Sequence, residues 1–151
     1  MGYEIKKQDL DGLSADQQVA IMESLVLAVV ADHKTTPAET KQFEAEVNAV
    51  PWNLEPAKVM EQLLAVRTRI IAMKTPEEAA SLINQVAERL PDPVLREKLF
   101  YAMGSIMASD LQMTLEEKNV LSVYVKAFGL TVDQVESIKT DIKSRAAQAT
   151  A

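Results

Sequence analysis

Signals that start helices recur along the whole chain. In a capping box, a Ser or Thr and a Glu or Gln three residues later satisfy two unpaired backbone N–H groups at a helix N-terminus. Five such pairs occur: Ser14 with Gln17, Thr36 with Glu39, Thr75 with Glu78, Thr114 with Glu117, and Thr131 with Gln134. Because no segment has the alternating pattern of a strand, the sequence predicts an all-α protein.

The helix boundaries follow from these caps and from proline and glycine. Pro37 and Pro76 stand at first helical positions, Asp92-Pro93 marks another start, and Gly129 is typical of a helix end. About seven helices are expected, over residues 15–31, 37–49, 54–73, 76–90, 93–108, 115–128 and 132–147. The connections are short, and 151 residues suit one domain. We therefore expect an N-terminal extension (1–13), a helical domain (14–147) and a frayed tail (148–151).

One pattern, D-x3-T-x2-E, occurs twice. It runs from Asp32 to Glu39 and, 78 residues later, from Asp110 to Glu117. Each copy follows a helix that is apolar nearly all round, and such a helix is usually buried on all sides. An internal repeat indicates how a whole chain is organised. We expect two pseudo-symmetric halves, with repeats centred on 20–50 and 98–128, around a central pair of buried helices.

The two aspartates raise a chemical question. Asp32 and Asp110 stand at helix C-termini, where a carboxylate is unfavourable by about 0.3–1 kcal/mol unless something compensates it. The side chain can accept N–H groups of its own loop, or point at the N-terminus of the next helix. It can also bind a hard cation such as Ca²⁺ or Mg²⁺, with Glu39 or Glu117 as a second ligand.

Two carboxylates are too few for a tight Ca²⁺ site, so backbone carbonyls and waters would complete a weak one. The second copy carries an additional carboxylate, Glu116, where the first has Ala38, and is the better candidate. The alternative is that both loops are capping devices only, since capping boxes recur at Thr75 and Thr131 without a preceding aspartate. His33, the single histidine, is expected to be solvated.

Composition excludes several function classes. The net charge is −6 without a Lys/Arg cluster, which argues against nucleic-acid binding. The chain has no cysteine, so disulfides and thiolate metal sites are excluded. The longest apolar run, 25–31, is too short to span a bilayer, and a cytoplasmic location is expected. No nucleophile–base arrangement is discernible, so the chain is not expected to be an enzyme.

The repeated pattern resembles the tellurite-resistance TerB-like family. In that family a buried helix ends in Ala/Ser-Asp and is followed by a short loop, a Ser/Thr cap and a Glu. The matching stretches here are Leu27 to Glu39 and Ile106 to Glu117, followed by Ala127 to Leu130. The family usually has Gly after the Asp, and His33 and Leu111 replace it in this chain. A glycine there permits positive φ and close approach of the backbone to an ion.

The resemblance implies a non-enzymatic module of stress response, with Asp32, Glu39, Asp110 and Glu117 at the family's acidic positions. Together with Glu116 of the second loop, these are the candidate metal ligands. It also implies protein partners, such as a membrane-associated stress complex, without insertion into the membrane. The alternative is a purely protein-binding adaptor or regulatory domain whose acidic loops only order the fold. Under that alternative an exposed apolar patch, for example around Trp52, would carry the function.

Overall fold

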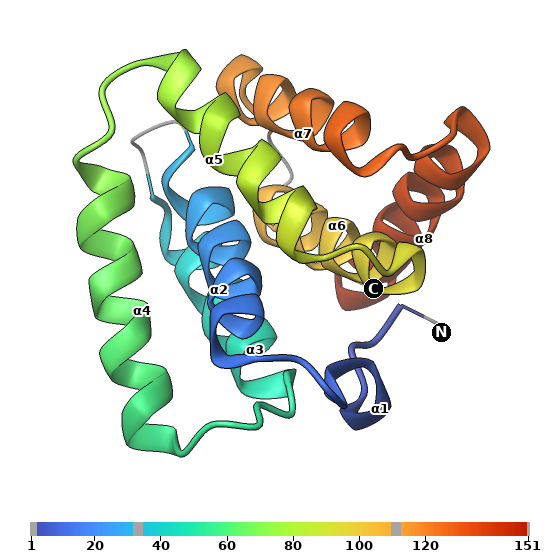
Figure 1. Cartoon of the computed structure of the whole chain (residues 1–151). Coiled ribbons are helices and arrows are strands. Elements are labelled where there is room, and N and C mark those ends of the chain that lie inside the picture. The colour runs from blue at the N-terminus through green and yellow to red at the C-terminus, as the bar shows by residue number, and fades with distance from the viewer. Residues whose placement is uncertain (1–2, 32–34, 110–112, 151) are drawn as a thin grey trace.

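The computed structural model describes residues 3–31, 35–109 and 113–150. The secondary-structure elements of these residues are all helices, joined by turns and loops (Figure 1). The all-α prediction is confirmed. The eight helices of this described part are α1 (Lys7–Leu10), α2 (Ala15–Val30), α3 (Pro37–Ala49), α4 (Pro56–Ile71), α5 (Pro76–Arg89), α6 (Pro93–Met107), α7 (Leu115–Phe128) and α8 (Val132–Thr150). The seven expected helices correspond to α2–α8, and α1 was not predicted.

The caps lie where the sequence predicts them. Ser14, Thr36, Thr75 and Thr114 each accept a hydrogen bond from the backbone N–H three residues on. Thr131 does the same for Gln134 at 3.1 Å. At the other end of α7, Gly129 adopts the left-handed conformation, with φ 68° and ψ 34°. These boundaries are therefore fixed by local hydrogen bonding and by the freedom of glycine at positive φ.

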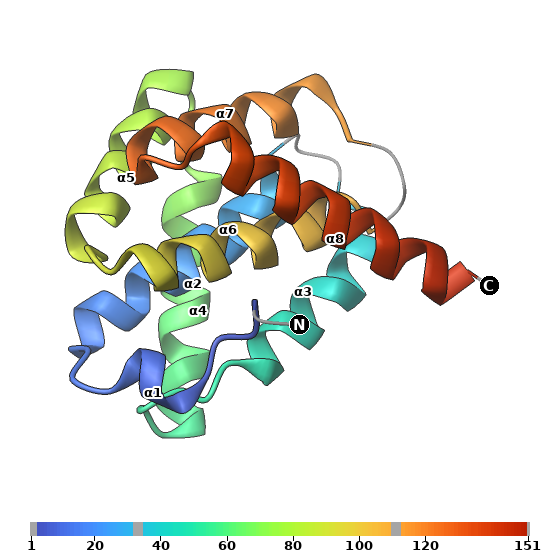
Figure 2. The ribbon, with the colours of Figure 1, turned by 90° about the vertical axis from the view of Figure 1, so that its right-hand side faces the viewer.

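Helices α2 and α6 form the centre of the molecule. Each contributes ten buried residues, whereas every other helix contributes at most four among the side chains that the structure describes. The two helices pack against each other; α3, α4 and α5 pack on α2, while α3, α7 and α8 pack on α6 (Figures 1 and 2). Both helices are apolar nearly all round, which explains their central position, because only a central helix can bury every side.

Buried charges tie the outer helices to this centre. Glu23, on α2, has a side chain that is only 3% exposed and pairs with Arg69 of α4 and Arg89 of α5. Arg96 of α6 donates to the carbonyl oxygen of Ala87 at 2.6 Å and to that of Phe128 at 3.3 Å. The guanidinium of Arg96 thus satisfies backbone acceptors near the ends of both α5 and α7.

The N-terminal extension packs on the domain from its first described residue. Tyr3 stacks on Tyr101 of α6 with ring centroids 4.7 Å apart, and Leu10 is fully buried. Asp9 and Lys98 form an ion pair of 2.7 Å, and both side chains are less than 10% exposed. The short helix α1 is held by these tertiary contacts, since four residues cannot form a stable helix alone.

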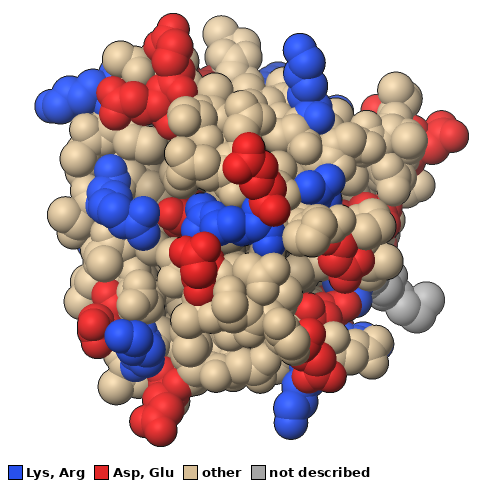
Figure 3. Space-filling view, in the orientation of Figure 1, with Lys and Arg blue, Asp and Glu red and all other residues tan. Residues whose placement is uncertain are grey.

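The surface mixes charges of both signs. On the face in Figure 3, acidic and basic side chains are interspersed without a broad basic patch. None of the helices in the described ranges is long and apolar enough to pass through a bilayer.

Candidate functional site

The first acidic loop leads from α2 into α3. At its end, Glu39 is only 1% exposed. Its Oε1 accepts hydrogen bonds from the Thr36 backbone N–H (3.1 Å) and the Thr36 hydroxyl (3.2 Å), while the Glu39 N–H donates to Thr36 Oγ1 (3.1 Å). The capping box thus fixes the Glu39 carboxylate at the start of α3, and the surrounding packing buries it.

The second loop leads from α6 into α7 and has the same local geometry. Glu117 is likewise 1% exposed. Its Oε1 accepts from the Thr114 N–H at 3.0 Å and from the Thr114 hydroxyl at 3.2 Å. The repeat found in the sequence thus recurs as a structural motif, in which both central helices lead to a buried, capped glutamate.

The aspartates of the pattern lie outside the described residues, and so does His33. Glu116 is described and exposed, and it lines a separate cavity of about 280 Å³ with residues of α2, α4 and α5. Successive helical residues point about 100° apart, so Glu116 and the buried Glu117 face different surroundings. Within the described ranges, no three His, Cys, Asp or Glu side chains come together as a metal site.

One atom of the first loop stands out. Glu39 Oε2 is buried, and no hydrogen-bond donor of the described part of the chain reaches it. A buried polar atom without a partner is costly, and a buried carboxylate is normally paired or coordinated to a metal. The exposed capping glutamate of α5, Glu78, has no such buried oxygen and provides an internal comparison.

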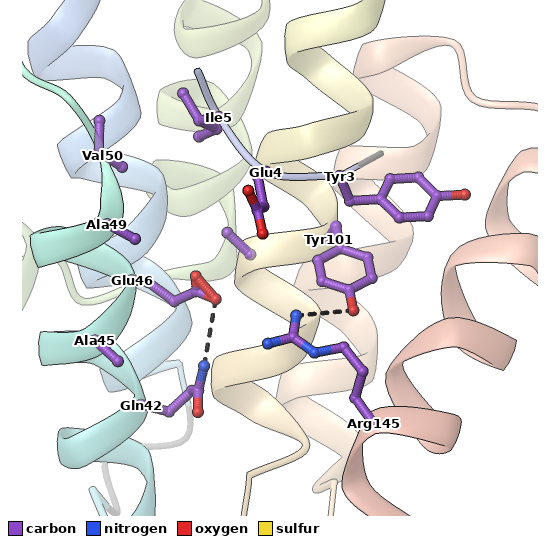
Figure 4. A pocket seen from close by; sticks show the side chains of 11 residues that line it. Tyr3, Glu4, Ile5, Gln42, Ala45, Glu46, Ala49, Val50, Tyr101 and Arg145 are labelled. Carbon is purple, nitrogen blue, oxygen red and sulfur yellow. Dashed lines mark hydrogen bonds between the residues drawn. The ribbon is translucent and has the colours of Figure 1, made fainter. Parts of the chain in front are cut away.

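A second cluster of polar side chains lies in a pocket of about 420 Å³. The pocket is bounded by α3, α6, α8 and the N-terminal segment Tyr3–Ile5 (Figure 4). Glu46 of α3 accepts a hydrogen bond from Gln42 at 3.3 Å. From the other side, Arg145 of α8 donates to the Tyr101 hydroxyl at 3.0 Å. Tyr101 in turn donates a short hydrogen bond to Asp141.

Burial shifts the proton affinities in this pocket. It raises the pKa of Glu46, against the smaller opposing effects of the Gln42 amide and the Arg145 charge. Burial also raises the pKa of Tyr101, and the hydrogen bond to Asp141 acts in the same direction. At neutral pH Tyr101 is a neutral donor held between Asp141 and Arg145. Tyr101, Asp141 and Arg145 satisfy one another's hydrogen-bonding groups and form a polar contact between α6 and α8.

No pattern in the sequence indicates this pocket. Its polar residues come from helices about 40 to 100 residues apart, and none belongs to a recurring motif. A half-buried glutamate such as Glu46 looks like any surface residue of an amphipathic helix in the sequence.

Comparison with protein-family models, with characterised proteins and with solved structures finds no match for this chain. Fold and site therefore define an all-helical protein with a duplicated, capped acidic loop. The resemblance to the TerB-like family depends on the residues of the two repeats.

Proposed function

We propose that this chain is a non-enzymatic TerB-like module of the tellurite-resistance type. Its two halves are related by an approximate two-fold axis, and each acidic loop binds a divalent cation, Ca²⁺ or Mg²⁺, weakly. The observation that carries the proposal is the buried Glu39 Oε2, which has no donor among the described residues. In the cell, the module acts in stress response with other proteins in the cytoplasm.

The chemistry of the loops supports this proposal. The capping box uses one carboxylate oxygen of Glu39 and leaves the second available. Ca²⁺ and Mg²⁺ take oxygen ligands, and a carboxylate that is already desolvated and fixed loses little freedom on binding them. Asp32 stands seven residues before Glu39 in the sequence, and Asp110 seven residues before Glu117. Water and loop carbonyls complete the coordination shell.

The test is an amide NMR titration of metal-stripped protein with Ca²⁺ and then Mg²⁺. We expect saturable shifts confined to residues 31–39 and 109–117. In Glu39→Gln the shifts of the first loop disappear, while Glu78→Gln, which alters a capping glutamate without a preceding aspartate, titrates like the wild type. Asp110→Asn with Glu117→Gln removes the response of the second loop. A flat titration at millimolar ion contradicts cation binding and makes the loops capping devices.

A protein-binding adaptor is the second candidate, and an exposed apolar stripe on α4 favours it. Met60, Leu64 and Ile71 are 58%, 62% and 54% exposed and lie on one side of the helix. Trp52 does not extend this stripe as an anchor, because it is half-buried and its indole N–H donates to the Val47 carbonyl at 3.0 Å. Exposed apolar surface of this kind often marks a protein interface.

This candidate predicts that Leu64→Glu abolishes binding of a co-purifying protein without lowering the melting temperature. The matched control is Val132→Glu on α8, because Val132 is also a highly exposed apolar residue, at 78%. Equal binding by both variants would exclude the α4 stripe as the interface.

A further inference from the structure

An apolar groove lies between α7 and α8. Both helices pack on α6 but make few contacts with each other, and they diverge from the turn at Gly129 (Figure 1). The cavity between them has a volume of about 650 Å³. Its apolar lining comes from all three helices and includes Phe100 and Gly104 of α6, Leu121 and Val125 of α7, and Ile138 and Ile142 of α8. Met113 of the second acidic loop also lines it, whereas the glutamates of the two loops do not.

Gly104 determines how closely α8 approaches the floor of this groove. A Cβ atom at this position would stand 2.8 Å from Ile142 Cδ1. The α8 side chain therefore rests directly on the backbone of α6. At this point α8 packs on α6, and the side of α8 that faces α7 is not covered by another helix. Leu121, Val125 and Ile142 are therefore only half-buried.

The rim of the groove is positively charged. Lys118 of α7 and Lys139 and Lys143 of α8 line it, and no Asp or Glu of the described residues does. None of the three lysines forms an ion pair within the described ranges. The chain has a net charge of −6, so these three lysines around one apolar groove create a local electrostatic potential of the opposite sign.

We propose that this groove binds a fatty acid, with the acyl chain between α7 and α8 and the carboxylate at the lysine rim. The volume falls within the range of about 300–1,000 Å³ that is typical of small-ligand sites. A two-chain phospholipid is larger than the ligands that such sites enclose. The lysines select an anionic head group, and the apolar walls select an unbranched hydrocarbon tail.

A protein partner fits this groove less well. Stable protein interfaces bury roughly 800 Å² on each side, with apolar surface that extends beyond a single furrow. Among the described residues, the large apolar side chains with high exposure are Met60, Leu64, Ile71, Val94, Leu115 and Val132, and none of them lines the groove. Leu115 and Val132 stand at the first positions of α7 and α8, outside the lining, so the apolar surface within the groove is a single furrow of the kind that a single-chain ligand fills.

The test is a methyl NMR titration of the full chain with laurate, kept below its micelle concentration. We expect saturable shifts of Leu121, Val125, Ile138 and Ile142 methyl groups, with Met60 and Leu64 unaffected as internal references. Dodecyltrimethylammonium, which has the same tail and a cationic head, is expected to bind at least about tenfold more weakly because the rim repels it.

Charge variants provide the matched comparison. In Lys139→Gln with Lys143→Gln, laurate affinity should fall about tenfold or more, and the dependence of affinity on salt should become shallower. Lys126→Gln changes an exposed lysine of α7 that does not line the groove and should leave affinity unchanged. Both variants alter exposed side chains, so their melting temperatures should equal that of the wild type.

Three results would overturn the proposal. The first is the absence of saturable methyl shifts, and the second is equal affinity for the anionic and cationic amphiphiles. The third is a concentration-dependent dimer, seen by light scattering, whose formation shifts the same methyl groups without ligand. Met113 places the second acidic loop beside the groove, so binding that persists both in Glu39→Gln and in Asp110→Asn with Glu117→Gln shows that the groove acts independently of the cation proposal.

Discussion

Tyr124 donates a hydrogen bond of 2.8 Å to the hydroxyl of Ser24, 100 residues earlier in the chain, and both side chains are fully buried. This contact joins α7 to the central helix α2. The Ser24 hydroxyl in turn donates a hydrogen bond of 3.1 Å to the carbonyl oxygen of Ala20. Burial raises the pKa of Tyr124 well above its ordinary value, so the phenol stays a donor throughout the neutral range.

Replacing Tyr124 with Phe should lower the free energy of unfolding by about 0.5–1.5 kcal/mol, since a buried acceptor loses its donor. Urea denaturation of Tyr124→Phe, Ser24→Ala and the double variant measures the coupling. We expect the double variant to be more stable than the sum of the single effects indicates, because removing both partners leaves no unpaired group. Strict additivity would show that the hydrogen bond contributes nothing.

The ion pair of Asp9 with Lys98 should make stability depend on acid pH. Burial raises the pKa of Asp9, but hydrogen bonds from Lys98 and the Lys6 backbone, with the attraction of both lysine charges, outweigh it and hold the pKa below its usual value. The ionised carboxylate therefore stabilises the fold above the unfolded pKa of about 3.9, and this contribution is lost as the pH falls through the lower folded value. The stability difference between wild type and Asp9→Asn should be constant above about pH 5 and shrink below about pH 4.

Removing the cation of the same pair should be more damaging than removing both charges. Lys98→Met leaves the buried Asp9 carboxylate without its cation and with the Lys6 backbone N–H as its remaining donor, at a cost of about 3–5 kcal/mol. Asp9→Asn with Lys98→Met should recover a large part of that loss. Thermal denaturation at pH 7 compares the three variants, and a double variant as unstable as Lys98→Met would contradict a paired buried charge.

The contact between Gly104 and Ile142 predicts a rescue. Gly104→Ala forces Ile142 Cδ1 away from α6, and overpacking of this kind costs about 1–3 kcal/mol, against a gain of up to about 1 kcal/mol from helix propensity. Ile142→Val removes that methyl group, so the pair Gly104→Ala and Ile142→Val should be more stable than Gly104→Ala alone. Guanidinium denaturation followed by circular dichroism measures this, and a lack of rescue would place the strain elsewhere.

Capping at the second acidic loop should stabilise the protein without any metal. Thr114→Ala removes the acceptor of the Glu117 N–H, and the expected loss is about 1 kcal/mol, as for other N-caps. Because this effect is local hydrogen bonding, the loss should be the same in EDTA and in millimolar Ca²⁺. A loss that appears only with Ca²⁺ would mean that Thr114 acts through the ion.

Local chemistry made most of the fold predictable. The caps at Thr36 and Thr114, the proline after Thr75 and the glycine at 129 act over four residues or fewer, and the helices begin and end within about two residues of these signals, apart from the end of α8. The sequence also predicts the central position of α2 and α6, because these helices are apolar nearly all round. Helix α1 was missed, since tertiary contacts of Leu10 and Asp9 hold its four residues.

In the candidate sites, too, some features follow from local sequence and others from tertiary packing. The sequence by itself determined the two capped glutamates, because a capping box brings Thr36 to Glu39 and Thr114 to Glu117 whatever the surrounding fold. Only the tertiary structure decided that both glutamates are buried, that Glu116 faces a different cavity, and that three lysines meet around an apolar groove. Burial and charge clustering depend on which helix faces pack together, and residues far apart in the chain set that packing.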